Sequence, residues 1–196
     1  MEGIRANEFI ITGRIINRRD RNNGDSLITI ASRNGKDVYP KVLCPKGMLP
    51  EKTDDRVHVK ATGHIIAKTH INEDKRVQYD QTLVADSIAL DQTIAEARFG
   101  KRGIFFPEPS CKIYLGGRVR SSMDDGGWIR LQIEVNEPRE EDGMLIRMSM
   151  KKLERQPRIS YGDNVCVAAS LSTPKKRIGG RNVYFEDILV EDIAID

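Results

Sequence analysis

The feature that most constrains this chain is an internal repeat. Residues 76–91 match residues 181–196 at a constant offset of 105 positions, so that Tyr79 aligns with Tyr184. Residues 9–15 match residues 113–119 at an offset of 104 positions. Two matches that occur in the same order and at nearly the same offset indicate a tandem duplication of a unit of about 85–90 residues.

Each unit alternates apolar and polar residues in the pattern of half-buried strands, and turn residues separate the strands. Asp20–Asp25 is a turn cluster, Asn34-Gly35 is a type I′ hairpin signal, and Asp124–Gly127 and Glu140–Gly143 mark turns in the second unit. The expected strands are 9–15, 27–33, 38–44, 56–68 and 77–90 in the first unit, and 112–121, 128–135, 145–150, 164–172 and 182–195 in the second. Five strands with a longer connection after the third are typical of an OB-fold barrel.

The predicted fold class is all-β, with two tandem five-stranded OB-fold barrels joined by a short helix and linker. The expected boundaries are 1–91 for the first OB-fold, 92–110 for the linker, and 111–196 for the second OB-fold. Within the linker, residues 91–100 have the pattern of a short helix closed by Gly100. We expect Phe105 and Phe106 to seal the two barrels against each other rather than to touch a ligand.

Composition excludes several classes of protein. Charged residues make up 31% of the 196 residues, and no apolar run approaches the roughly 20 residues that span a bilayer. The first residues show no secretory signal, so a cytoplasmic location with reduced thiols is expected. The three cysteines, which lack CxxC spacing, predict neither a disulfide framework nor a zinc site. The net charge of +3 permits a polyanionic partner without arguing for one.

Five segments of the first unit carry a family resemblance. They are Asn7–Ile15, Leu27–Ser32, Val42–Lys46, Asp55–Gly63 and Tyr79–Val84. In this order they resemble the bacterial single-stranded DNA-binding protein family, and the second unit shares the ends of the pattern more than its middle. The resemblance implies an OB barrel, sequence-tolerant binding of single strands, and four barrels in each functional assembly.

The chain also departs from that family. Where the family usually places stacking aromatic residues, this chain has Lys36, Val38, Cys44 and His70. The family's flexible tail with an acidic end has no counterpart after the last strand, so recruitment of replication enzymes through such a tail is not expected.

The hairpins before the last strand of each unit are the clearest candidates for phosphate contacts, because this hairpin flanks the oligonucleotide channel in OB-folds. The hairpin at 173–181 carries four cations and no acid, whereas the hairpin at 68–76 is more mixed. Their candidate residues are Lys68, His70, Lys75, Arg76, Lys175, Lys176, Arg177 and Arg181. An ordinary solvated hairpin is the alternative in each unit.

Other candidates lie on the strands, where single-strand binding needs cations for phosphates and flat side chains for bases. On the fourth strand, Val57, Val59 and Ala61 alternate with an outward polar row of His58, Lys60, Thr62 and His64. The outward cations of the first and fourth strands are Arg14, Arg118 and Lys60, and those that could extend a phosphate track in the second unit are Arg147, Lys151 and Lys152. The stacking candidates are Tyr39 with Lys41, Trp128 with Arg130, and the repeated Tyr79 and Tyr184. A packing role is an equally good interpretation of Trp128 and of the paired tyrosines.

The sequence gives little support for a catalytic function. His58, His64 and His70 are six residues apart, about 20 Å between neighbours on an extended strand, so they cannot share a metal on one straight strand. The sequence contains no phosphate loop, HExxH motif or nucleophile elbow. We therefore expect a binding protein with no catalytic residues, no metal and no cofactor.

The leading hypothesis is a sequence-nonspecific single-stranded DNA-binding protein, with RNA as an open alternative partner. The competing hypothesis is an OB-fold protein-interaction or scaffolding module with weak or no nucleic-acid binding. No membrane partner is expected. Because twofold dimers are the commonest assemblies, we expect a homodimer with four barrels, and Ile10 and Tyr114 are weak candidates for an exposed apolar surface.

Overall fold

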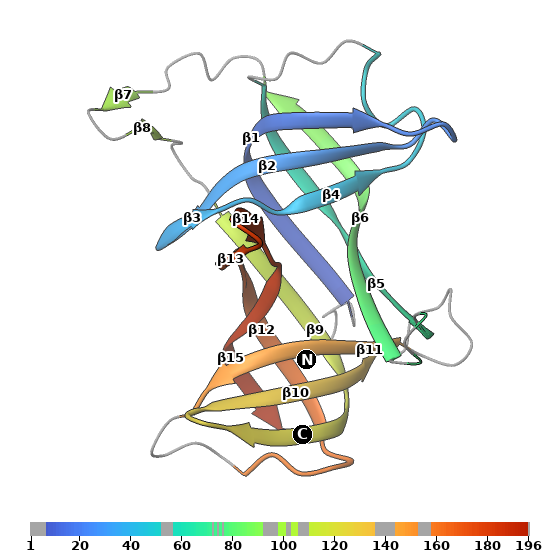
Figure 1. Cartoon of the computed structure of the whole chain (residues 1–196), viewed down its shortest axis with the longest axis vertical. Coiled ribbons are helices and arrows are strands. Elements are labelled where there is room, and N and C mark those ends of the chain that lie inside the picture. Colours follow the sequence, from blue (N-terminus) through green and yellow to red (C-terminus); the bar gives the residue numbers. More distant parts are fainter. Residues whose placement is uncertain are drawn as a thin grey trace.

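The computed structural model describes residues 7–51, 57–71, 73, 75, 77–91, 98–100, 103–105, 110–135, 144–152 and 158–195. These residues form strands and connections only, and no helix occurs among them. The all-β class predicted from the alternation is confirmed, and Figure 1 shows the strands arranged in an upper and a lower group.

The first unit closes into a ring of five paired strands. Its elements are β1 (Asn7–Asp20), β2 (Ser26–Asn34), β3 (Lys36–Val38), β4 (Lys41–Cys44), β5 (His58–Ile71) and β6 (Val77–Asp91). The ring runs β1–β2–β4–β6–β5 and returns to β1, with β3 extending from β2. Only the β4–β6 pairing in this ring is parallel. Every second residue of β1 and β2 points inward, which places Phe9, Ile11, Ile28 and Ile30 in the core.

The second unit repeats this order of pairing. Its elements are β9 (Ser110–Asp125), β10 (Trp128–Val135), β11 (Met144–Lys151), β12 (Asn164–Ser172), β13 (Lys175–Ile178), β14 (Arg181–Tyr184) and β15 (Asp187–Ile195). The ring runs β9–β10–β11–β15–β12 and returns to β9, with a parallel β11–β15 pairing in the place of β4–β6. The strands β13 and β14 form a separate hairpin between β12 and β15.

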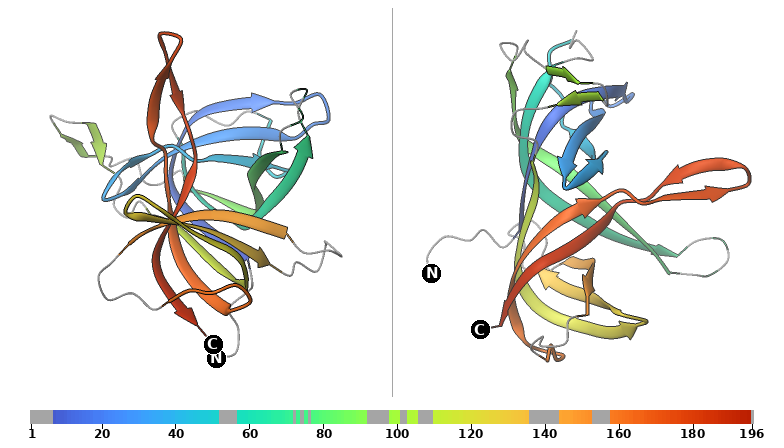
Figure 2. Two further views of the ribbon diagram at one scale, coloured as in Figure 1. Left: turned by 60° about the horizontal axis from the view of Figure 1, so that its bottom comes forward. Right: turned by 90° about the vertical axis from the view of Figure 1, so that its left-hand side faces the viewer.

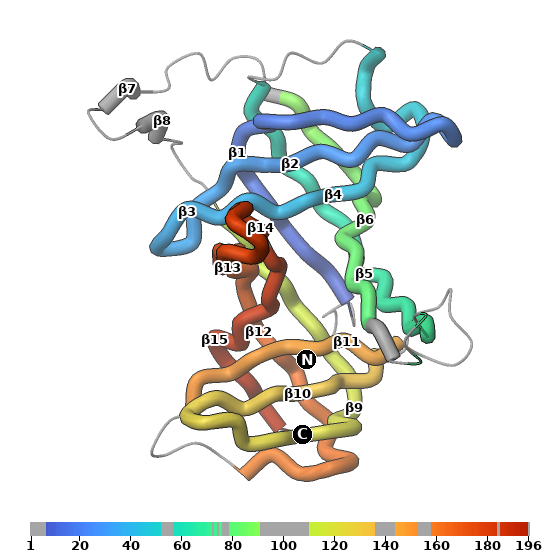
Figure 3. Tube along the Cα trace, viewed as in Figure 1, coloured from blue at the N-terminus to red at the C-terminus, as the bar shows by residue number. Residues whose placement is uncertain are grey.

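The two rings are joined by their first strands. Residues 7–12 of β1 pair antiparallel with residues 110–115 of β9, and Figure 3 shows these strands side by side. Phe9 lies opposite Ile113, its counterpart at the 104-residue offset, and both side chains are fully buried. A local twofold axis therefore passes through this pair, and the joint makes one continuous 11-stranded sheet.

The turns predicted at Asp20–Asp25, Asn34-Gly35 and Asp124–Gly127 are found, with one difference in turn type, whereas Glu140–Gly143 lies outside the described residues. Gly126 and Gly127 have φ of 56° and 94°, and Gly179 and Gly180 have φ of 56° and 80°, which are the values that a type I′ turn requires. The chain also reverses at Asn34-Gly35, but only Gly35 has a positive φ there. The type I′ assignment at that turn was therefore wrong.

The strict alternation expected on the fourth strand is also wrong beyond Thr62. A β-bulge between Thr62 and Gly63 shifts the side-chain phase by one residue, so His64 points inward and is only 6% exposed. Its Nδ1 lies 3.0 Å from each carboxylate oxygen of Asp86. The sequence pattern placed His64 in an outward polar row, because a bulge leaves no simple signature in hydropathy.

Two of the expected strands are divided. The strand expected at 38–44 breaks at Tyr39-Pro40, since proline lacks the amide hydrogen that a central strand needs. The strand expected at 182–195 is divided into β14 and β15. The short helix is not found at residues 98–100, which form β7 (Arg98–Gly100) and pair with β8 (Gly103–Phe105). The rest of that helix, residues 92–97, and the side chains of Phe105 and Phe106 lie outside the described residues.

The three cysteines are free thiols, and two of them are buried. Burial raises the pKa of Cys44 and of Cys111 to about 12, which keeps both thiols protonated near neutral pH. Within the described residues, no helix has the length and apolar composition needed to cross a membrane.

Candidate nucleic-acid interface

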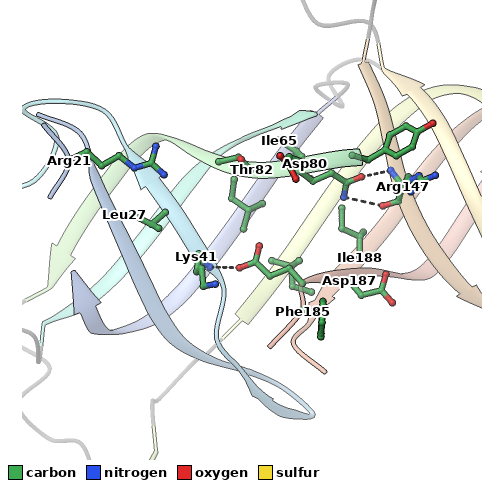
Figure 4. A pocket seen from close by; sticks show the side chains of 15 residues that line it. Arg21, Leu27, Lys41, Ile65, Asp80, Thr82, Arg147, Phe185, Asp187 and Ile188 are labelled. Atoms are coloured by element: carbon green, nitrogen blue, oxygen red, sulfur yellow. Dashed lines mark hydrogen bonds between the residues drawn. The ribbon is translucent and has the colours of Figure 1, made fainter. Parts of the chain in front are cut away.

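A cleft of about 580 Å³ lies between the two rings. Figure 4 shows residues of β2, β4 and β6 on one side and residues of β11 and the start of β15 on the other. The cleft is lined by Arg21, Leu27, Lys41, Ile65, Tyr79, Asp80, Gln81, Thr82, Leu83, Arg147, Leu171, Phe185, Glu186, Asp187 and Ile188. It therefore combines cations, aromatic rings and apolar surface.

Three of the predicted site residues meet in this cleft although they come from distant parts of the sequence. The guanidinium of Arg147 lies 3.5 Å from the centre of the Tyr79 ring, a cation–π contact between the two units. Lys41 lines the same cleft, and its backbone N–H donates to Glu186 Oε1 at 2.7 Å. A cation stacked on a half-buried ring and a second cation elsewhere in the same cleft suit a strand with phosphates and flat bases.

A second hollow, of about 380 Å³, continues from the cleft over the outer face of the second unit. It is lined by residues of β9, β10 and β11 and shares Arg147 and Asp187 with the cleft. Met123 in this hollow is 61% exposed, and Trp128 at the start of β10 is 38% exposed. Trp128 pairs with Lys151, so the predicted combination of an aromatic ring and cations is present on this face.

Carboxylates neutralise part of the predicted phosphate track. Arg130 Nε lies 3.3 Å from Asp125 Oδ2, and Arg130 Nη1 lies 3.7 Å from Asp187 Oδ2. Lys152 forms an ion pair with Asp124. These pairs lower the net positive charge of the face, and a phosphate must displace or bypass them.

The positive charges of the β13–β14 hairpin are less neutralised by neighbouring acids. Figure 2 shows it projecting from the body in both views. Lys175, Lys176, Arg177 and Arg181 are exposed, and no ion pair within the described residues involves them. The ammonium of Lys176 lies 5.5 Å from the centre of the Phe185 ring, which lines the cleft. The hairpin is therefore a cationic arm attached at its base to the cleft.

The remaining predicted residues lie elsewhere. Arg14, Lys60 and Arg118 do not line the cleft or the second hollow, and Arg118 Nε donates to the Gly162 carbonyl at 3.0 Å. The backbone N–H of Tyr39 donates to Thr173 Oγ1 at 3.2 Å, a second contact between the two units away from the β1–β9 joint. On the first unit's hairpin, Lys68, His70 and Lys75 are exposed, and His70 lies 3.4 Å from Asp80. Arg76 and the side chain of Tyr184 lie outside the described residues.

Sequence reasoning missed several residues of this surface, namely Gln81, Phe185, Glu186, Asp187 and Met123. Gln81 and Glu186 occupy the same position of the repeat, and this equivalence is the signal that could have singled them out.

The comparisons with known proteins concern the fold. No protein-family model matches the sequence, and no curated protein sequence matches it. A solved structure of a deletion mutant of the single-stranded DNA-binding protein from Thermus aquaticus superimposes with a TM-score of 0.62 at 12% identity, covering 97% of this chain and 94% of that chain. The wild-type protein from the same organism gives a TM-score of 0.58 at 13% identity, covering 97% and 92%. The likeness extends over nearly the whole of each chain.

Proposed function

Because the chain shares the OB-fold architecture of a bacterial single-stranded DNA-binding protein, we propose that it binds single-stranded DNA without sequence preference. The observation that carries this proposal is the cleft in which Lys41, Tyr79 and Arg147 come together from two units. The protein would coat or protect single strands in replication, recombination, repair or mobile-element transfer. It acts in this proposal as a binding protein and not as an enzyme.

The mechanism combines phosphate contacts with limited stacking. Cations of the cleft and of the β13–β14 hairpin contact phosphates, so affinity falls steeply as salt rises. Tyr79 and Trp128 supply flat surfaces that accept any base. The two OB-fold domains are residues 1–91 and 111–196, with residues 92–110 as the linker. OB-folds bind oligonucleotides of both kinds, so RNA is a second substrate to test.

The competing function is a protein-interaction or scaffolding module. The ion pairs of Arg130 and Lys152 favour it, because they reduce the charge available to phosphates. The few aromatic residues, 6% of the chain, point the same way.

Titration with oligo-dT at low salt separates the two functions. The chain has one tryptophan, Trp128, whose partly exposed ring lies two residues before Arg130, a residue of the second hollow, on the same strand. We expect Trp128 fluorescence to be quenched with a Kd in the micromolar range or below, and affinity to decrease linearly in log–log plots against salt. No binding at micromolar protein would overturn the proposed function in favour of the scaffolding module. Oligo-U in a parallel titration compares RNA with DNA.

We also propose a homodimer that carries four barrels, since closed twofold dimers are the usual assembly. Ile10 and Tyr114 do not support it: they are half-buried and lie at the β1–β9 joint, opposite Lys112 and Glu8. Light scattering in moderate salt is expected to give twice the chain mass of 22.2 kDa. A measured mass equal to one chain would refute the dimer but not DNA binding by two barrels.

A further inference from the structure

The two sides of the cleft carry equivalent residues of the repeat. Leu43 pairs with Val84 in the first unit, and Ser149 pairs with Leu189 in the second. Val84 and Leu189 are 105 positions apart, so Leu43 corresponds to Ser149. Two residues before them on the same strands are Lys41 and Arg147, two of the three cations that line the cleft.

The backbones of these two residues are held by equivalent partners. The backbone N–H of Arg147 donates to Gln81 Oε1 at 2.5 Å, and the backbone N–H of Lys41 donates to Glu186 Oε1 at 2.7 Å. Gln81 and Glu186 are 105 positions apart. Gln81 lies within β6, and Glu186 lies directly before β15. Each unit therefore reaches across the cleft with the same position of the repeat and holds the backbone of the equivalent residue of its neighbour, as the dashed lines in Figure 4 show.

The two bonds differ in chemistry. The Gln81 amide also donates through Nε2 to the Arg147 carbonyl at 3.2 Å, so this end of the cleft is held by two hydrogen bonds and by the stack on Tyr79. An ionised Glu186 can accept from Lys41 but has no hydrogen to donate. The walls of the cleft withdraw water from the Glu186 carboxyl and raise its pKa, although part of the side chain remains open to solvent.

Charge is the second difference. Glu186 places a carboxylate beside Lys41, where Gln81 places a neutral amide beside Arg147. The other charged residues that line the cleft are Arg21, Asp80 and Asp187. A phosphate entering at Lys41 therefore meets an acid that is absent at the equivalent place beside Arg147, and like charges in a partly desolvated cleft repel each other.

We propose that Gln81 and Glu186 are positioning residues that hold Arg147 and Lys41 as a matched pair of phosphate contacts, and that the Glu186 carboxylate limits the affinity of the cleft for single-stranded nucleic acid. This inference rests on the proposed function, and it adds that the two halves of the cleft bind unequally. Gln81 in one half and Glu186 in the other determine which half of the cleft binds more tightly.

Exchanging the two residues tests the inference. Glu186→Gln removes the negative charge, keeps the acceptor for Lys41 and supplies an amide donor, so we expect affinity for oligo-dT at low salt to rise roughly three- to ten-fold. Gln81→Glu adds the charge beside Arg147 and loses the donor, so affinity should fall by a similar factor. The double variant Q81E/E186Q keeps the net charge and should bind more like the wild type than Q81E does.

Matched controls separate local from overall charge. Asp192→Asn makes the same charge change as E186Q at an exposed position farther along β15, and Asn164→Asp makes the same change as Q81E at the start of β12. Affinities of E186Q and Q81E equal to those of their controls would overturn this inference while leaving DNA binding intact. Wild-type protein that does not bind oligo-dT would overturn the proposed function, and the inference with it. Should Q81E not melt cooperatively, Q81A removes the same bonds without adding charge and should still weaken binding.

Discussion

Replacing Gly63 by alanine is expected to destabilise the first ring by about 3 kcal/mol, because the added methyl group has no room. A Cβ at this position would lie 2.0 Å from the Val84 carbonyl oxygen and 2.8 Å from Cζ of Phe9. The first neighbour is backbone in a paired strand and the second is a fully buried ring, so neither can move cheaply. Thermal or urea unfolding followed by circular dichroism measures the loss.

The second unit supplies the control. Gly63 pairs with Phe9, and the equivalent residue Ala169 pairs with Ile113, so an alanine is tolerated where the opposite side chain is smaller. The reverse substitution Ala169→Gly should cost only about 1 kcal/mol, through backbone entropy and lost contacts. A Gly63→Ala variant as stable as the wild type would show that the first ring can relax around the methyl group.

Replacing Lys175, Lys176 and Arg177 together by alanine should reduce the slope of log affinity against log salt by about 2, since each lost contact with a single strand removes roughly 0.7. Affinity for oligo-dT at low salt should fall roughly ten- to a hundred-fold on the same grounds. The loss should be similar for all sequences, because phosphate contacts carry no base information. Fluorescence titrations of Trp128 at several salt concentrations provide both quantities.

The comparison variant is Lys60→Ala with Arg118→Ala, which removes two exposed cations that line neither the cleft nor the second hollow. We expect this pair to leave the slope nearly unchanged. An unchanged slope in the hairpin variant would mean that its cations face solvent in the complex and that the phosphate path lies entirely within the cleft.

Much of the fold could be predicted from the sequence because its signals are local. The strand β10 at Trp128–Val135 and the strand β12 at Asn164–Ser172 begin and end where the alternation places them. The Gly179-Gly180 turn follows from the φ values that only glycine adopts easily. His64 and the broken strand at Pro40 could not be placed by the same reasoning, because a bulge and a proline interrupt the two-residue period.

The candidate site was predictable residue by residue but not as an arrangement. Tyr79 and Arg147 are 68 positions apart and belong to different units, so no spacing in the sequence indicates their contact. The acids that neutralise Arg130 show the same limit. Asp125 is five residues away in a turn, but Asp187 reaches Arg130 only through the parallel pairing of β11 with β15.

The joint between β1 and β9 also has a consequence during synthesis. Residues 7–12 leave the ribosome early, yet their partners at 110–115 are made about 100 residues later, a delay of about 5–20 s at ordinary elongation rates. Through that interval β1 has β2 and β5 as partners within its own unit, while the edge that β9 will cover stays open. An open edge with apolar residues such as Ile10 is a template for pairing with another nascent chain. Conditions that slow elongation between residues 12 and 110 should therefore increase aggregation of the nascent protein.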